Sequence, residues 1–160
     1  MIERVYVETS IISYLLGRLS RDTIIAAHQH ITRSWWDVYA ARYELTISEL
    51  VYQEASAGDP SAAQARVELL KRLPILAISN DAILLSEALI KSGPIPREYG
   101  ADALHIALAA VNGIDYLLTW NCKHLANATL RNRITALVEG KGYASPVICT
   151  PEELMEGNDA

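Results

Sequence analysis

Short apolar runs alternate with longer helical patterns along the chain, and this alternation limits the possible folds more than any other feature. Runs rich in β-branched and aromatic residues predict buried strands, and apolar residues at helical spacing predict amphipathic helices. The predicted strands cover residues 4–7, 45–47, 75–78, 115–119 and 147–149. The predicted helices cover residues 22–43, 49–57, 59–72, 80–91, 102–112 and 130–139, with a short helix after residue 150. The pattern predicts an α/β fold with a central parallel sheet of about four to five short strands, flanked by helices on both faces.

Composition favours one globular domain over residues 1–160, because the chain is 51% hydrophobic and 21% charged. We expect no membrane span, since no apolar run reaches the roughly 18 residues that a span requires. The N-terminus lacks a signal-peptide pattern, and Cys122 and Cys149 are too few for a disulfide scaffold, so we expect a cytoplasmic protein. The net charge of −5 is unusual for a nucleic-acid-binding protein, but acids that bind a metal would lower the charge without excluding nucleic acid.

Asp102 stands at the start of an otherwise apolar helical stretch, A-D-A-L-H-I-A-L-A at residues 101–109. A carboxylate beside a core is costly to bury unless it is paired or binds a metal. The free N–H groups and the positive dipole of a first helical turn favour an acid there. Asp102 is therefore either an isolated helix-terminal acid or part of a site that other acids complete.

Two further acids and an amide are expected near Asp102. Glu8 directly follows the first predicted strand, Glu54 lies on the helix after the second, and Asn121 follows the fourth. In open α/β sheets, sites lie beyond the carboxyl ends of the strands. Closely spaced carboxylates repel each other, and Mg²⁺ or Mn²⁺ relieves that repulsion because these ions prefer oxygen ligands. Since such an ion also lowers the pKa of water and stabilises charge on a phosphoryl group, the pattern indicates metal-dependent phosphoryl chemistry.

Four short motifs carry these residues: V-Y-V-E-T-S-I-I at 5–12, I-S-E-L-V-Y-Q-E at 47–54, D-A-L-H-I-A at 102–107 and L-L-T-W-N-C-K-H at 117–124. In order and spacing, and over nearly the whole chain, they resemble the motifs of PIN-domain ribonucleases, most of all the virulence-associated toxin C (VapC) group. The resemblance implies a metal-dependent endoribonuclease that hydrolyses RNA phosphodiester bonds with a metal-activated water. It also implies the toxin of a type II toxin–antitoxin pair, with an RNA substrate, a cognate antitoxin partner and a homodimeric assembly.

By this resemblance, Glu8, Glu54 and Asp102 would hold Mg²⁺ or Mn²⁺, and Asn121 would be a weak ligand or would orient water. The chain departs from the family pattern at two of these positions, because Glu8 and Asn121 stand where Asp is usual. Glutamate moves the carboxylate outward by about 1.5 Å, and the amide of Asn121 is neutral. These departures leave the number of metals open. They support an alternative, a catalytically weak or inactive PIN-like module that binds RNA or a protein partner.

Each candidate ligand also has a purely structural interpretation. Glu8 could begin a helix, Glu54 could be a solvated helix residue, and Asn121 could shape a turn. Glu49 lies five residues before Glu54, so both cannot easily face one point of a helix. The motif spacing favours Glu54.

Several neighbouring side chains are candidates for supporting roles. Thr9, Ser10 and Thr119 could hydrogen-bond to ligands or substrate, or could simply cap helices and turns. His105 lies three residues after Asp102, on a neighbouring helix face. A lone histidine on an apolar helix is typical of a satisfied core residue, so His105 is a candidate for support rather than for ligation.

Basic side chains near the expected site could hold RNA phosphates or could form an ordinary solvated face. They are Arg97, Lys123, His124, Arg131 and Arg133. Other phosphoryl-transfer classes fit less well. A phosphatase that forms an aspartyl-phosphate needs Asp where Glu8 stands, and the glycine patterns of P-loop and dinucleotide enzymes do not occur.

Overall fold

A five-stranded parallel sheet forms the centre of the computed structural model, which describes residues 1–155. Residues 156–160 of the predicted domain lie outside the described residues. The strands follow the order β3-β2-β1-β4-β5 across the sheet, and every neighbouring pair is parallel. The strands are β1 (Arg4–Val7), β2 (Glu44–Ser48), β3 (Ile75–Leu76), β4 (Tyr116–Leu118) and β5 (Val147–Cys149). The predicted α/β fold with a parallel sheet is confirmed.

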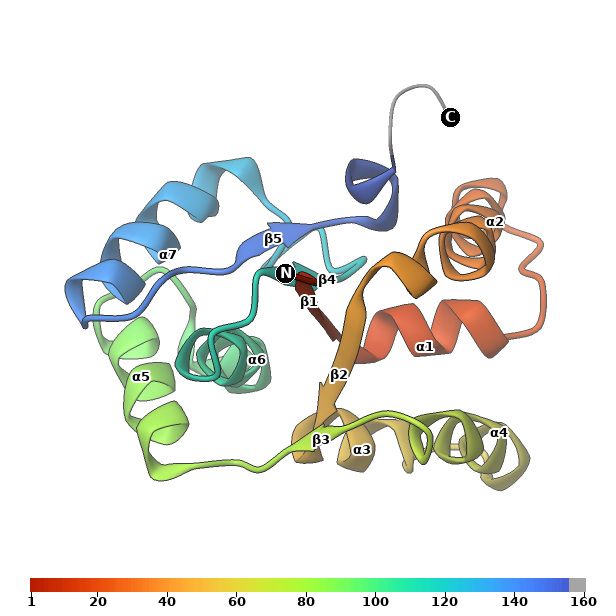
Figure 1. The fold of residues 1–160 in the computed structure, drawn as a ribbon, viewed down its shortest axis with the longest axis horizontal. Coiled ribbons are helices and arrows are strands. Elements are labelled where there is room, and N and C mark those ends of the chain that lie inside the picture. The colour runs from red at the N-terminus through yellow and green to blue at the C-terminus, as the bar shows by residue number, and fades with distance from the viewer. Residues whose placement is uncertain (156–160) are drawn as a thin grey trace.

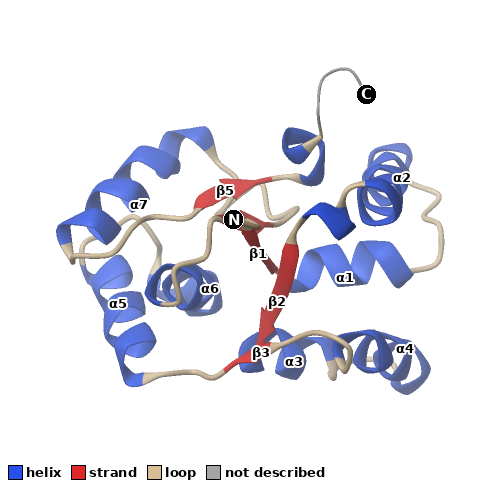
Figure 2. Ribbon diagram, in the orientation of Figure 1, coloured by secondary structure: helices blue, strands red, loops and turns tan. Residues whose placement is uncertain are grey.

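Helices cover both faces of the sheet, as predicted. In Figure 1, α5, α6 and α7 lie on one side of the strands, and α1, α2 and α4 lie on the other. Figure 2 shows the same arrangement, with the red strands running between the two groups of blue helices. The helices are α1 (Thr9–Leu16), α2 (Thr23–Val38), α3 (Glu49–Ala55), α4 (Pro60–Leu70), α5 (Asn80–Lys91), α6 (Gly100–Val111) and α7 (Ala128–Gly140). None of the described helices is both long and apolar enough to cross a membrane.

Short polar side chains begin several of these helices where the sequence predicts. The hydroxyl of Ser48 accepts a hydrogen bond from a backbone N–H and begins α3, and Asp59 does the same for α4, with Pro60 at its first position. Helix α1 was not predicted, several boundaries differ from prediction by one or two residues, and the ends of α2 and β3 also differ. Helix α2 ends at Val38 and is followed by a 3₁₀ turn at Ala40–Arg42, because helix ends often tighten in this way. The third strand pairs over residues 75–76 rather than 75–78.

The N-cap of α2 offers a test of the role of polar side chains in beginning these helices. The Asp22 carboxylate accepts hydrogen bonds from the backbone N–H groups of Ile24 and Ile25, at 2.9 and 3.0 Å. Replacing Asp22 with alanine should lower the free energy of unfolding by about 1 kcal/mol. Replacing it with asparagine should lower that free energy much less, because asparagine is a comparable N-cap residue. Urea denaturation followed by circular dichroism would measure both. Equal losses in the two variants would contradict a capping role.

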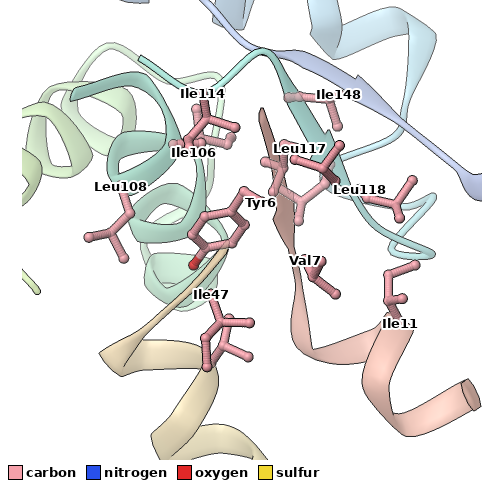
Figure 3. Close-up of a cluster of buried hydrophobic side chains, with 14 of the residues drawn as sticks. Tyr6, Val7, Ile11, Ile47, Ile106, Leu108, Ile114, Leu117, Leu118 and Ile148 are labelled. Carbon is pink, nitrogen blue, oxygen red and sulfur yellow. The ribbon is translucent and has the colours of Figure 1, made fainter. Parts of the chain in front are cut away.

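The centre of the sheet is apolar on both faces because helices cover both. Val5, Tyr6 and Val7 of β1 are fully buried, as are Leu117 and Leu118 of β4. Figure 3 shows Tyr6 and Val7 beside Leu117 and Leu118. In the sheet, β2 lies on one side of β1, and β4 lies on the other side of β1. The carboxyl ends of β1 and β4 therefore form the switch point at which α/β sheets bind ligands.

Candidate active site

Three separate parts of the chain bring ionisable side chains together at the carboxyl ends of the strands. Glu8 follows β1, Glu54 lies in the last turn of α3, and His105 lies on α6. One possible ligand atom of each lies within 4.8 Å of the others. We call these three residues the glutamate group. It contains two of the three predicted metal ligands and the histidine predicted to support them.

Glu8 is held by the start of its own helix and by the end of β4. Glu8 as a whole residue is 8% exposed, and its Oε1 accepts hydrogen bonds from the hydroxyls of Ser10 (2.5 Å) and Thr119 (2.6 Å). Its Oε2 accepts a longer bond from the backbone N–H of Ser10, at 3.2 Å. Glu8 is thus the N-cap of α1. It is also held by the hydroxyl of Thr119, directly after β4, and a helix cap does not require this second contact.

Glu54 is similarly fixed through one oxygen. Its Oε1 accepts hydrogen bonds from the hydroxyl of Thr9 (2.6 Å) and from Nε2 of His105 (2.8 Å). Burial alone would raise the pKa of Glu54, but the hydrogen bond and electrostatic attraction to His105, with the hydrogen bond from Thr9, outweigh it and hold the pKa below its usual range. The side chain is 33% exposed, so Glu54 offers an ionised and accessible carboxylate.

His105 is almost fully buried, and both of its ring nitrogens have partners. Nδ1 lies 2.7 Å from the hydroxyl of Tyr6, which lies 2.7 Å from the hydroxyl of Ser48. The Ser48 oxygen also accepts the backbone N–H of Val51, at 3.2 Å. Burial raises the pKa of Tyr6, so its hydroxyl stays protonated. The sequence pattern predicts Tyr6 only as a strand residue, and it does not predict this connection of Tyr6 and Ser48 to the site.

Asp102 lies outside the glutamate group and belongs to a second cluster. Its Oδ1 accepts a hydrogen bond from Nδ2 of Asn121 (3.1 Å), and its Oδ2 lies 3.3 Å from Nδ1 of His124. Burial raises the pKa of Asp102, and the neighbouring His124 offsets this only in part. We call Asp102, Asn121 and His124 the aspartate group.

Asn121 shapes a turn, which is one of the interpretations that the sequence left open, and it also contacts Asp102. Its Oδ1 accepts the backbone N–H of His124 (3.1 Å) and so shapes the turn, while its Nδ2 holds Asp102. Its own backbone N–H donates to the hydroxyl of Thr119 (2.9 Å), which also binds Glu8. Thr119 therefore links the two groups.

The basic side chains predicted to contact RNA differ in their surroundings. Arg97, in the 3₁₀ turn before α6, and Lys123, after β4, are both exposed. Arg131 is half-buried and pairs with Glu153 at 3.2 Å. His124 stacks on Tyr99 with ring centroids 3.6 Å apart. Lys123 and Arg97, and Arg133, which is also exposed, thus remain the more accessible candidates.

The donor set fits a hard divalent cation. Carboxylate oxygens from Glu8 and Glu54 converge, and Asp102 adds carboxylate oxygens at the neighbouring cluster, where Asn121 presents its amide nitrogen to Asp102. Mg²⁺ and Mn²⁺ prefer such oxygen ligands. Both ring nitrogens of His105 already make hydrogen bonds, so the atoms left to bind a metal are mainly oxygens.

Comparisons with known proteins bear on the fold and the family of the chain. Among solved structures, the chain is similar to VapBC2 from Rickettsia felis bound to a promoter DNA fragment, with 17% identity, a TM-score of 0.56 and coverage of 92% of this chain and 98% of that chain. It is also similar to a toxin–antitoxin complex from Klebsiella pneumoniae, with 19% identity, a TM-score of 0.59 and coverage of 92% and 97%. At these identities the likeness concerns the fold.

A third similar structure is VapC20 from Mycobacterium tuberculosis, described as a toxin that cleaves the sarcin–ricin loop. It is 15% identical, with a TM-score of 0.56 and coverage of 88% of this chain and 96% of that chain. A comparison with curated proteins finds no match. A family model described as PIN domain matches residues 5–125, which include every residue of the glutamate and aspartate groups. The chain therefore belongs to the PIN domain family.

Proposed function

We propose that this chain is a metal-dependent endoribonuclease and the toxin of a toxin–antitoxin pair. The observation that carries the proposal is the convergence of Glu8 and Glu54 at the carboxyl ends of the strands, beside Asp102. Two carboxylates this close repel each other unless a cation lies between or beside them. Membership of the PIN domain family and a fold shared with toxins, one of which is described as cleaving RNA of the sarcin–ricin loop, support the proposal.

Glu8, Glu54 and Asp102 would hold Mg²⁺ or Mn²⁺, with Asn121 as a weak ligand or as a residue that orients water. A bound ion of this kind supplies water of lowered pKa and positive charge against a phosphoryl oxygen. The chain's own side chains do the positioning. Thr9, Ser10 and Thr119 fix the two glutamates by hydrogen bonds of 2.5 to 2.6 Å.

Partners follow from the same proposal. Exposed Lys123 and Arg97 would contact RNA phosphates, and Arg131 would contribute if its pair with Glu153 opened. The structures from Rickettsia felis and Klebsiella pneumoniae are toxin–antitoxin complexes, which supports a cognate antitoxin for this chain. We further propose a homodimer that acts in the cytoplasm.

The aspartate group favours a second candidate function. Both carboxylate oxygens of Asp102 already have partners within the chain, and Asn121 supplies no negative charge. Such a site would bind a cation less strongly than one with a fourth acid. The second candidate is therefore a PIN-like module that binds RNA or a protein without cutting RNA.

Cleavage of a mixed pool of structured and single-stranded RNA separates these candidates. We expect purified protein to cut RNA with Mn²⁺ or Mg²⁺, and EDTA to abolish the cutting. Asp102→Asn should reduce the rate by about 100-fold or more, since loss of a ligand exceeds the 10- to 100-fold cost of losing an outer hydrogen-bond partner. Asp81→Asn is a matched control, because Asp81 also lies in the first turn of a helix but is exposed.

Either of two results would contradict the nuclease proposal. Folded wild-type protein that neither cuts RNA nor binds Mn²⁺ at millimolar concentration would favour the binding module. Cutting that persists in Asp102→Asn would indicate a contaminating nuclease or a site in another part of the chain.

A further inference from the structure

A continuous series of hydrogen bonds joins the buried core to Glu54. It runs from the backbone N–H of Val51 to Ser48, then to Tyr6, His105 and finally Oε1 of Glu54, with distances of 3.2, 2.7, 2.7 and 2.8 Å. Ser48 and Tyr6 are fully buried and His105 is 1% exposed. Figure 3 shows the Tyr6 ring reaching from β1 toward α6, the helix that carries His105. Only the Glu54 end of the series meets solvent.

The two ends of this series determine the direction of its hydrogen bonds. A backbone N–H can only donate, so Ser48 accepts from Val51. A carboxylate can only accept, so Nε2 of His105 donates to Glu54. In a neutral imidazole Nδ1 is then an acceptor, and Tyr6 donates to it. The Tyr6 oxygen in turn accepts the proton of Ser48, and every buried polar group in the series is satisfied.

The other protonation states fit less well. A doubly protonated His105 would donate to Tyr6, and Tyr6 would donate to Ser48. The Ser48 proton would then lack an acceptor among the hydrogen bonds of residues 1–155, in a place with no access to water. An unsatisfied buried donor of this kind destabilises that protonation state. A neutral ring with its proton on Nδ1 could not donate to Glu54 at all.

The geometry therefore points to His105 as a positioning residue: we propose that Tyr6 and Ser48 hold it as the Nε2–H tautomer, and that it fixes Glu54 so that Oε2 is left to bind the metal. The hydrogen bonds that described residues make to Glu54 both reach Oε1, one from His105 and one from Thr9. Without the His105 bond, the flexible glutamate side chain could turn away from Glu8. His105 is not itself a ligand, since both of its nitrogens are engaged. This inference rests on the proposed metal-dependent function.

Two substitutions of His105 separate its two contacts. In His105→Gln the side-chain amide can reach Glu54 as Nε2 does, whereas in His105→Asn the shorter amide replaces only Nδ1, beside Tyr6. We expect glutamine to keep Mn²⁺ affinity within about threefold of wild type. Asparagine should weaken Mn²⁺ binding by about 10- to 100-fold, the usual cost of losing an outer hydrogen-bond partner. Isothermal titration calorimetry with Mn²⁺ alone measures both, and thermal unfolding confirms that each variant is folded.

Nitrogen NMR of the imidazole provides a test that needs no metal. In the metal-free wild-type protein we expect His105 to be protonated at Nε2 and not at Nδ1. Tyr6→Phe removes the hydroxyl that bonds to Nδ1, so the two neutral tautomers should become mixed. A His105 ring that carries its proton on Nδ1, or on both nitrogens, would overturn the proposal.

The outcomes distinguish this inference from the proposed function. Wild-type affinity in His105→Asn, or equal losses in the asparagine and glutamine variants, would overturn the positioning role, and equal losses would indicate direct ligation. A wild-type protein that binds no Mn²⁺ would overturn it as well. Protein that shows the expected tautomer and Mn²⁺ affinities but cuts no RNA would support the positioning role and contradict the nuclease proposal.

Discussion

Replacing Glu54 with glutamine should reduce metal-dependent RNA cleavage by about 100-fold or more while leaving the fold intact. The amide oxygen can still accept from Thr9 and His105, so the packing of α3 is kept. The negative charge that would bind the cation is lost. Removal of an outer hydrogen-bond partner alone commonly costs 10- to 100-fold, and loss of a direct ligand should cost more. Single-turnover cleavage rates at saturating protein would measure the change.

Glu49→Gln provides a matched control for this prediction. Glu49 lies on the same helix, five residues earlier, and its side chain is exposed. Its substitution removes the same charge from α3 without touching the glutamate group, so the cleavage rate should stay within about twofold of wild type. If Glu49→Gln proved as harmful as Glu54→Gln, the site would have been assigned to the wrong end of α3.

Replacing Trp35 with alanine should lower the free energy of unfolding by about 3–5 kcal/mol. Trp35 is fully buried in α2, and its ring stacks on Tyr43 with centroids 5.9 Å apart, where the chain enters β2. The loss would be a large part of the 5–15 kcal/mol that stabilises a typical domain. Chemical denaturation, with the midpoint and slope fitted together, would measure it.

Trp35→Phe tests the cause of that loss. Within the described part of the chain, Nε1 of Trp35 has no hydrogen-bond partner. Phenylalanine therefore forfeits no hydrogen bond and leaves a smaller cavity, so it should cost clearly less than alanine. Equal costs would show that the indole N–H matters more than the ring volume does.

The fold could be predicted closely because its signals are local. Apolar runs bounded by polar caps mark most strands and helices within one or two residues, as Ser48 and Asp59 illustrate. The end of α2 was harder. Tyr39 and Ala40 are buried and apolar like helix residues, so nothing local distinguishes a helical turn from the 3₁₀ turn that precedes β2.

The candidate site was less predictable than the fold. Motif spacing was enough to select Glu8 and Glu54, which the structure brings together, and Asp102, which lies close enough to interact with Glu8. Spacing did not predict that the Asp102 carboxylate contacts His124. That contact depends on the conformation of the loop after β4, which spacing does not describe. The bond between Tyr6 and His105 spans 99 positions in the sequence, and a tyrosine in a strand has the same pattern whether or not its hydroxyl has a partner.

The short edges of the sheet bear on how the protein behaves at high concentration. At one edge β3 has only Ile75 and Leu76, and at the other β5 has three residues. A proline directly precedes each of these strands, at positions 74 and 146, and proline has no N–H to offer an incoming chain. Long unprotected edges are where proteins aggregate by adding strands from other molecules. This sheet offers little template for such growth, so the chain should resist strand-mediated aggregation even when it accumulates without a partner.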